Sequence, residues 1–193
     1  HLIEKGWDSK WAQHVADEID NDIHYQQTLA VYQLIHQYMP NARTIDAVRR
    51  ESPYTFGREL DIHVPLLWHY DMAPFAYDAI NDGKTEVWQY TCLQPQFDYL
   101  SRLGDYPLIS TRLLGWYNFK HGLRGFLHYA WNNYNVCRQR FNPFADASCF
   151  NSFPCDAFIV YPDRNNLTVL ESVRSTAMRD SFEDYELLLL ASK

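Results

Sequence analysis

The order of strand-like and helix-like segments is the feature that most constrains the fold of this chain. Runs rich in β-branched and aromatic residues alternate with longer segments in which apolar residues recur at helical spacing. The predicted strands are residues 11–17, 43–48, 60–67, 85–93, 125–135 and 156–162. The predicted helices are residues 23–40, 73–82 and 106–122, followed by a long last helix that opens with a capping box at Thr168–Glu171. The helix at 106–122 has Pro107 in its first turn and Gly122 as its C-cap. This alternation predicts an α/β fold with about six mostly parallel strands and outer helices.

Two architectures fit this alternation. The predicted strands either form an open sheet or are the C-terminal part of an eight-stranded (β/α)8 TIM-type barrel. In both cases ligands bind at the carboxyl ends of the strands. The chain has 193 residues, enough for one sizeable domain, and no repeat, low-complexity tract or Gly/Ser linker divides it. We therefore expect residues 1–193 to form a single domain.

Charge and composition exclude several classes of partner. The net charge is −7 and the only tight basic pair is Arg49–Arg50, so we expect no nucleic-acid partner. No apolar run approaches the ~20 residues of a membrane span, so we expect no membrane partner. Without a CxxC pair, an HExxH motif or a Gly-rich phosphate loop, we expect no metal and no cofactor. Aromatic residues make up 16% of the chain, which suits a core but also a cleft that stacks on sugars.

The start of the chain and its cysteines bear on its cellular context. The chain begins at His1 and not at Met, so we expect a piece of a longer protein and leave the compartment open. Of the four cysteines, Cys149 and Cys155 would form a disulfide only if the protein is exported to an oxidising compartment.

Two adjacent carboxylates, Asp17 and Glu18, follow the first predicted strand. Side chains alternate between faces within a strand, but the alternation lapses where a strand ends, so both carboxylates can turn toward one site. The simpler interpretation makes them acidic residues in the first turn of the next helix, where the helix dipole favours negative charge. The spacing alone is compatible with both interpretations.

Rings and amides occupy two of the later strands. Trp88 and Tyr90 share one face of their predicted strand, and Trp131 and Asn132 lie toward the end of theirs. Such a group suits the hydroxyl groups and ring faces of sugars. His63 lies in the middle of another predicted strand and is a further candidate for substrate binding. Trp88 and His63 each have a second interpretation as core residues, and His63 would then be a hydrogen-bonded core histidine.

Four segments carry a resemblance to a known family. The opening "HLIEKGW…HVADEID" resembles a strand bearing an Asp-Glu pair, and "GWYNFKHGLRGFLHYAWNNYN" resembles a penultimate barrel strand. "DAFIVYP" and "ESVRSTAMRDSFEDYELL" resemble a last strand and helix. The residues that match in this helix are Ser172, Arg174, Arg179, Glu183, Asp184, Tyr185 and Glu186. Together these segments resemble the C-terminal catalytic region of glycoside hydrolase family 123 over nearly the whole chain.

This resemblance implies a reaction and two residue roles. It implies retaining hydrolysis of N-acetyl-β-galactosaminides or related N-acetylhexosaminides, with the substrate's own 2-acetamido group as the nucleophile. By matching position, Glu18 would be the general acid/base, and Asp17 would orient and polarise the acetamido group. An ordinary retaining glycosidase needs a nucleophilic carboxylate ~5 Å from the acid. When the substrate supplies the nucleophile, that residue is not required, which accounts for two acids side by side.

The resemblance also implies that part of the barrel is missing. The Asp-Glu strand of such barrels is usually near the fourth, so the first three strands would lie outside this chain and two sheet edges would be exposed. We expect a carbohydrate substrate as one partner. We expect self-association, or pairing with the missing barrel half, as another, and the isolated fragment could be inactive.

Two other functions stay open at this point. A non-catalytic glycan-binding or interaction module would keep the aromatic cleft without turnover. A two-carboxylate glycosidase without acetamido assistance would use Asp46 or Glu86 as the partner carboxylate, and would cleave substrates that lack the N-acetyl group equally well.

Overall fold

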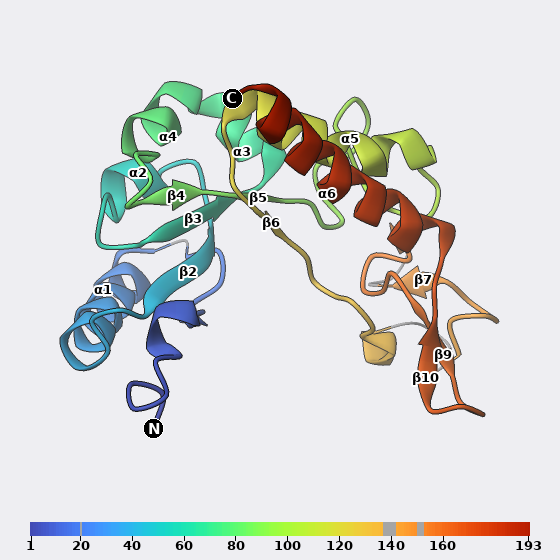
Figure 1. Cartoon of the computed structure of the whole chain (residues 1–193), viewed down its shortest axis with the longest axis horizontal. Helices are drawn as coiled ribbons and strands as arrows, with labels where there is room; N and C mark the ends of the chain where they lie inside the picture. Colours follow the sequence, from blue (N-terminus) through green and yellow to red (C-terminus); the bar gives the residue numbers. More distant parts are fainter. Residues whose placement is uncertain (20, 137–141, 150–152) are drawn as a thin grey trace. The chain divides into compact units, whose positions relative to one another are not determined.

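The computed structural model describes residues 1–19, 21–136, 142–149 and 153–193 (Figure 1). The chain divides into two compact units. The first comprises His1–Tyr90 and Leu123–Leu127, and the second comprises Thr91–Gly122 and His128–Lys193. Each unit is described by itself below.

Parallel strands form the centre of the first unit. They are β1 (Ala12–Gln13), β2 (Arg43–Val48), β3 (Ile62–Pro65), β4 (Glu86–Val87), β5 (Gln89–Tyr90) and β6 (Phe126–Leu127). The first four form one sheet in the order β1-β2-β3-β4, and β5 pairs with β6, all in parallel. A parallel bridge between Leu66 and Tyr90 continues the pairing of β3 past its end. Spatial neighbours therefore follow chain order, as predicted, and within the described residues these strands form no closed barrel.

Helices connect these strands. They are α1 (Asp22–Tyr38), α2 (Ser52–Thr55), α3 (Leu67–Met72) and α4 (Pro74–Ile80), preceded by the short 3-10 helix η1 (Asp8–Lys10). The Asn21 side chain caps α1 by accepting a hydrogen bond of 3.0 Å from the His24 N–H. The predictions of α1, α4 and β2 are confirmed. The sequence did not predict α2 and α3, which are each less than two turns long and so show no helical periodicity.

The core of the first unit lies between the sheet and its helices. Its fully or nearly fully buried side chains include Tyr32, Leu60, Ile62, Val64, Leu67, Tyr77 and Val87. Polar groups in this core are paired. For example, the Asp61 carboxylate accepts the Thr44 N–H at 2.7 Å, and the Asp61 N–H donates to Thr44 Oγ1 at 3.1 Å. These reciprocal bonds fix β2 against the start of β3.

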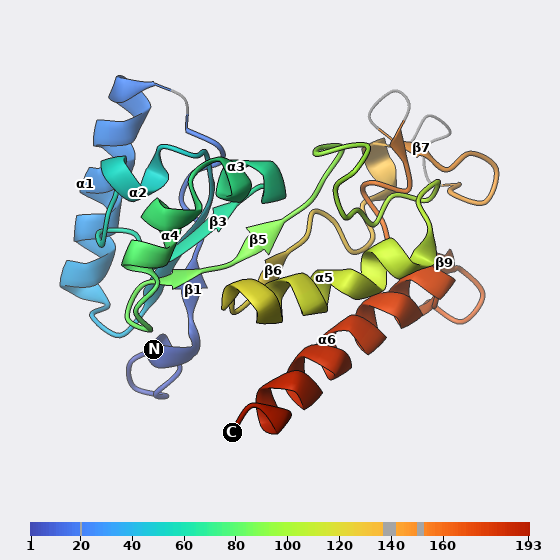
Figure 2. The ribbon, with the colours of Figure 1, turned by 90° about the horizontal axis from the view of Figure 1, so that it is seen from above.

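Two long helices dominate the second unit. α5 (Leu108–His121) and α6 (Val173–Ala191) lie side by side (Figures 1 and 2). Gly115 permits this close packing, because a Cβ atom there would lie 2.0 Å from the Ser181 carbonyl oxygen. Gly122 ends α5 in the left-handed conformation with φ +65°, which confirms the predicted cap. The unit also contains η2 (Tyr134–Val136) and two antiparallel hairpins, β7 (Ser148–Cys149) with β8 (Phe153–Pro154) and β9 (Tyr161–Asp163) with β10 (Thr168–Leu170).

The strand predicted at 156–162 is wrong over most of its length. Ala157, Phe158 and Ile159 are fully buried, but this stretch has only an isolated antiparallel bridge to Asn132. The Arg174 guanidinium binds the carbonyl oxygens of Phe158 at 2.9 Å and of Cys155 at 3.2 Å. The stretch also makes backbone hydrogen bonds of 2.9 Å from the Asn133 N–H to the Ala157 carbonyl oxygen and from the Ile159 N–H to the Trp131 carbonyl oxygen, so it pairs locally without forming a regular strand.

Two further details differ from the sequence-based expectation. β6 covers Phe126–Leu127 only, and the capping box of α6 is Ser172 with Ser175, because Thr168–Leu170 pairs with β9. The Cys149 side chain lies outside the described residues, so its pairing with Cys155 stays a prediction.

Candidate active site

Asp17 and Glu18 lie at the carboxyl end of the parallel sheet. Asp17 forms a parallel bridge with Ala47 of β2, and the Glu18 N–H donates to the Ala47 carbonyl oxygen at 3.0 Å. The helix α1 begins only at Asp22, which is the acidic residue of its first turn. The alternative interpretation of Asp17 and Glu18 as first-turn acids is therefore wrong. Their position is the one at which α/β enzymes bind ligands.

A buried carboxylate holds the backbone that leads to this pair. The Asp46 Oδ1 atom accepts the N–H groups of Val15 and Ala16, each at 2.9 Å, and Oδ2 accepts the Tyr32 hydroxyl. Asp46 is 1% exposed. Burial raises the pKa of the Asp46 carboxyl, and the hydrogen bonds from Tyr32, Ala16 and Val15 oppose this shift. The Asp46 carboxylate thus binds the N–H groups of the two residues just before Asp17, which a neighbouring strand would bind in a regular sheet.

Glu18 is held at both its backbone and its side chain. Its φ of +44° lies in the left-handed region, which costs a non-glycine residue roughly 1–2 kcal/mol. The Tyr90 hydroxyl, at the end of β5, donates a hydrogen bond to Glu18 Oε1. Tyr90 is 7% exposed, whereas Asp17 is exposed. The structure therefore fixes one carboxyl oxygen of Glu18 and presents Asp17 to solvent beside it.

His69 of α3 lies near the same carboxylate. Its ring stacks on Trp68 with centroids 5.3 Å apart and an interplanar angle of 21°. Burial lowers the pKa of His69, and the charges of Glu18 and Glu51 partly oppose that shift. Its position just after the third parallel strand was the available signal, since catalytic groups gather at carboxyl ends of strands.

His63 lies in the core of the first unit. It is fully buried, its Nδ1 pairs with Ser52 Oγ at 2.7 Å, and its Nε2 pairs with the Gly57 carbonyl oxygen at 2.8 Å. Burial lowers the pKa of His63 to about 4. The structure thus places His63 in the core, where both ring nitrogens are paired and its hydrogen bonds give it a structural role.

Trp88 contacts two other residues of the first unit, Glu86 and Gly125. Its Nε1–H donates to Glu86 Oε2 at 3.0 Å, and its ring lies against Gly125, where a Cβ atom would come within 2.2 Å of Trp88 Cδ2. Trp131 is 52% exposed, and Asn132 forms the bridge to Phe158. Trp131 and Asn132 belong to the second unit, so their place in a common site with Glu18 stays a prediction.

The carboxylates that a two-carboxylate mechanism would need are engaged elsewhere. Asp46 is buried among the groups described above. Glu86 is the first residue of β4, at the amino end of the sheet, and its Oε1 lies 3.0 Å from Arg43 Nη1. Neither carboxylate is placed to attack a sugar held at Glu18.

Metal and membrane sites were also sought in the described residues. No group of three or more His, Cys, Asp or Glu side chains there has the geometry to hold a metal ion. Among the helices in the described part of the chain, none combines the length and apolar character needed to cross a membrane.

Adjacent carboxylates at the carboxyl end of parallel strands are an arrangement in which α/β enzymes carry out acid–base chemistry. The comparison with protein families is more specific. Residues 1–191 match the family described as "Glycoside hydrolase 123, catalytic domain", and the chain belongs to this family. This confirms the resemblance noted in the sequence and assigns the chain to a glycosidase family, whose substrate is a carbohydrate. No curated protein matches the chain.

Proposed function

We propose that the chain carries the catalytic residues of a retaining, substrate-assisted N-acetyl-β-galactosaminidase or a related N-acetylhexosaminidase. Glu18 protonates the glycosidic oxygen, and Asp17 orients the 2-acetamido group and offsets the positive charge of the oxazolinium ion that forms. The acetamido oxygen attacks the anomeric carbon as the bond to the leaving oxygen breaks. Water, deprotonated by Glu18, then opens the oxazolinium ring and gives a product with retained configuration.

One observation carries this proposal. Asp17 and Glu18 are neighbours at the carboxyl end of the parallel sheet, and the Tyr90 hydroxyl holds the Glu18 carboxylate there. A retaining enzyme with its own nucleophile needs a second carboxylate facing the acid across the sugar. The two other carboxylates considered, Asp46 and Glu86, are buried or paired at other places. The arrangement therefore favours a nucleophile supplied by the substrate.

The same proposal extends to the architecture. We propose that the parallel strands β1 to β6 are the later part of a (β/α)8 barrel, because their spatial order follows chain order. β1 and β6 are then the outer strands of this part, and their outer edges are the places at which a second copy or the remaining barrel half would pair. Trp88, Tyr90, Trp131 and Asn132 are the proposed lining of the substrate site, with Tyr90 supported by its bond to Glu18.

The test uses three 4-nitrophenyl glycosides, the N-acetyl-β-galactosaminide, the N-acetyl-β-glucosaminide and the plain β-galactoside. We expect hydrolysis of the N-acetylated substrates only. Replacing the acetyl group by its mono-, di- and trifluoro derivatives weakens the nucleophile, so the rate should fall along the series. Equal hydrolysis of the plain galactoside, or a rate insensitive to fluorination, would overturn acetamido assistance. Glycan binding without hydrolysis would favour the non-catalytic module instead.

A further inference from the structure

The backbone of Glu18 has a conformation that its surroundings must maintain. Its φ of +44° lies in the left-handed region, which is unfavourable for a residue with a Cβ atom. Two contacts with Ala47 of β2 hold this backbone in place, the parallel bridge from Asp17 and the hydrogen bond of 3.0 Å from the Glu18 N–H. The Tyr90 hydroxyl reaches only the end of the side chain, at Oε1. The alignment of the preceding segment with β2 therefore decides where the Glu18 carboxylate lies.

A side chain of β2 provides this alignment. Regular pairing of β1 with β2 covers two residue pairs, and pairing resumes as the isolated bridge at Asp17. Between them, Asp46 Oδ1 accepts the N–H groups of Val15 and Ala16, each at 2.9 Å. Asp46 directly precedes Ala47 in β2, so the two groups that hold the segment belong to adjacent residues. The Asp46 carboxylate thus replaces strand pairing over the two residues before Asp17.

The helix α1 holds this carboxylate through Tyr32. Asp46 Oδ2 accepts the hydroxyl of Tyr32, which is fully buried and whose ring packs on Phe56 with centroids 5.5 Å apart. On the solvent side, the half-exposed His14 ring has its Nε2 atom 3.4 Å from Oδ1. The backbone N–H groups and the tyrosine O–H are donors, which fits an ionised carboxylate because that group only accepts. Asp46 is therefore fixed to α1 as well as to the segment that leads to Glu18.

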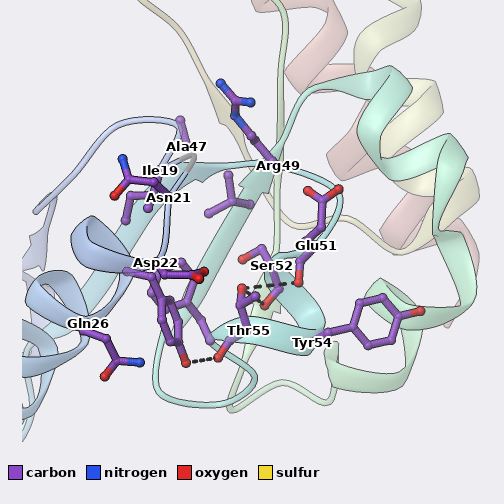
Figure 3. Close-up of a pocket in the computed structure, with 13 residues that line it drawn as sticks. Ile19, Asn21, Asp22, Gln26, Ala47, Arg49, Glu51, Ser52, Tyr54 and Thr55 are labelled. Atoms are coloured by element: carbon purple, nitrogen blue, oxygen red, sulfur yellow. Dashed lines mark hydrogen bonds between the residues drawn. The ribbon is translucent and has the colours of Figure 1, made fainter.

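A pocket in the first unit shows that α1 depends on such individual contacts. It has a volume of about 690 Å³ and opens between the start of α1 and the segment that follows β2, with Gln26 on one side and Thr55 on the other (Figure 3). The Tyr25 hydroxyl donates to the Thr55 carbonyl oxygen and links the two sides. Close packing is interrupted at this pocket, so we expect that removing the buried bond from Tyr32 would loosen Asp46.

We infer that Asp46, held by Tyr32, is a positioning residue for the proposed acid, and that its carboxylate keeps Glu18 in the left-handed conformation. Without its two N–H bonds, the segment before Asp17 would lose its alignment with β2, and the Glu18 backbone would relax to negative φ. The carboxylate would then turn away from Tyr90 and from a leaving oxygen. A misplacement of about 1 Å can cost ~10² in rate. The effect on catalysis rests on the proposed function, whereas the effect on the Glu18 backbone does not.

Asp61 provides a matched control toward the opposite end of β2. Its Oδ2 atom accepts the Thr44 N–H at 2.7 Å and pairs with His36 Nε2 at 2.9 Å, so it too binds backbone and a side chain of α1. Asp46→Ala and Asp61→Ala each remove a carboxylate, and Asp46→Asn retains one acceptor oxygen. Tyr32→Phe removes only the hydroxyl that holds Asp46, and it carries the test if Asp46→Ala does not fold.

The kinetic measurement compares methyl and 4-nitrophenyl N-acetyl-β-galactosaminide, with kcat and KM determined separately. We expect Asp46→Ala to lower kcat for the methyl glycoside ~10- to 100-fold with KM within about 2-fold, because the acid is misplaced while the sugar site remains. The 4-nitrophenyl glycoside should lose less, since its leaving group needs less protonation. Asp46→Asn should restore part of the loss, and Tyr32→Phe should lower kcat by a smaller factor.

Asp61→Ala should leave kcat for both glycosides within about 2-fold, even where urea unfolding shows a loss of stability equal to that of Asp46→Ala. A merely structural role of Asp46 would lower stability without this dependence on the leaving group. A wild-type kcat for the methyl glycoside in Asp46→Ala and Tyr32→Phe, or an equal fall in Asp61→Ala, would overturn the inference.

Amide hydrogen exchange measured by NMR needs no turnover and so separates this inference from the proposed function. Asp46→Ala should speed the exchange of the Glu18 N–H and of the two N–H groups bound to Asp46 at least ~10-fold, and should leave that of Thr44 unchanged. Asp61→Ala should show the reverse pattern, and Tyr32→Phe should follow Asp46→Ala. If the wild type hydrolyses neither glycoside, the proposed function fails and this pattern alone decides the role of Asp46. Unchanged protection of the Glu18 N–H in Asp46→Ala and Tyr32→Phe would show that Asp46 does not position the acid.

Discussion

The hydroxyl of Tyr90 donates a hydrogen bond to Oε1 of Glu18, and so joins the ends of two strands that lie 72 residues apart in the chain. This bond occupies one carboxyl oxygen of Glu18 and directs the other away from the phenol. A general acid must hold its proton within hydrogen-bond reach of the leaving oxygen. Tyr90 is therefore a positioning residue for the proposed reaction, and its contribution can be measured without removing the acid itself.

Tyr90→Phe should lower kcat about 10- to 100-fold and change KM little. The substitution removes one hydrogen bond to a charged group, worth ~1.5–3 kcal/mol, and leaves the ring in place. Tyr70→Phe is the control, because Tyr70 also donates to a carboxylate, Asp78 Oδ1 at 2.8 Å, and is also buried. Steady-state kinetics and thermal unfolding of both variants distinguish the roles. A kcat as high as that of the wild type in Tyr90→Phe would contradict the positioning role.

Glu18→Gln should abolish the hydrolysis of sugars with poor leaving groups and preserve their binding. The substitution removes the proton donor, which contributes typically ~10²–10⁴-fold, but keeps the size of the side chain. Aryl glycosides with activated leaving groups need less protonation and should lose less rate in their first step. Glu59→Gln, at an exposed position of the same unit, is the control. A wild-type rate of Glu18→Gln on methyl N-acetyl-β-galactosaminide, which has a poor leaving group, would end the assignment of the acid.

Asp17→Asn should lower kcat by ~10²–10³ with a smaller change in KM. Asn can still accept a hydrogen bond from the acetamido N–H, but it lacks the charge that offsets the oxazolinium ion. Because that charge develops only in the transition state, binding of the ground state should be less affected. Asp98→Asn, an exposed position of the second unit, is the control. Equal losses in Asp17→Asn and Asp98→Asn would show that Asp17 has no specific role in the reaction.

Local sequence signals predicted the elements that depend on local interactions. The β-branched and apolar run Arg43–Val48 is β2 at the predicted bounds, and Pro107 and Gly122 flank α5 as expected. The stretch at 156–160 does not form a regular strand, because side chains bind several of its carbonyl oxygens, among them Arg174, whose hydrogen bond to Phe158 spans 16 residues. The hydrophobic pattern of an apolar run does not show whether its backbone groups bind a neighbouring strand or a side chain.

The part of the candidate site that lies at the end of a strand could be predicted from the sequence. Asp17 and Glu18 were selected from their place after a predicted strand and from the family resemblance, and the structure puts them at the carboxyl end of the sheet. The support from Asp46 was not predictable, because a carboxylate within a buried strand gives no sign that it will bind the Val15 and Ala16 N–H groups 31 and 30 residues away.

Gly115→Ala should destabilise the protein by ~1–3 kcal/mol, although the same change inside a free helix stabilises it by ~1 kcal/mol. The added Cβ would lie 2.0 Å from the Ser181 carbonyl oxygen, so α5 and α6 would have to separate. Urea unfolding measures the change, with Lys120→Ala at an exposed position of α5 as the control. An increase in the free energy of unfolding would show that the helices do not pack closely at Gly115.

The free energy of unfolding should fall as the pH is lowered from about 6.5 to about 4, because of His63. Burial lowers the pKa of His63 to about 4 in the folded protein, whereas an unfolded histidine has a pKa of ~6.5. Above pH 6.5 both states are neutral at this residue and the stability is fully present. Below it the unfolded state binds a proton that the folded state does not, so stability is lost down to about pH 4, by up to ~3 kcal/mol.

His63→Gln removes this titration and keeps an amide that can pair with Ser52 and with the Gly57 carbonyl oxygen. The substitution also changes the stability at pH 7, so the quantity to compare is the change in the free energy of unfolding between pH 7 and pH 4.5, measured by urea unfolding. That change should be smaller in the variant than in the wild type. His128, whose pKa burial lowers to about 2, titrates in the same direction in both proteins and cancels in the difference. Equal pH dependence in the two proteins would mean that His63 is accessible to protons in the folded state, and the structural role assigned to it would be wrong.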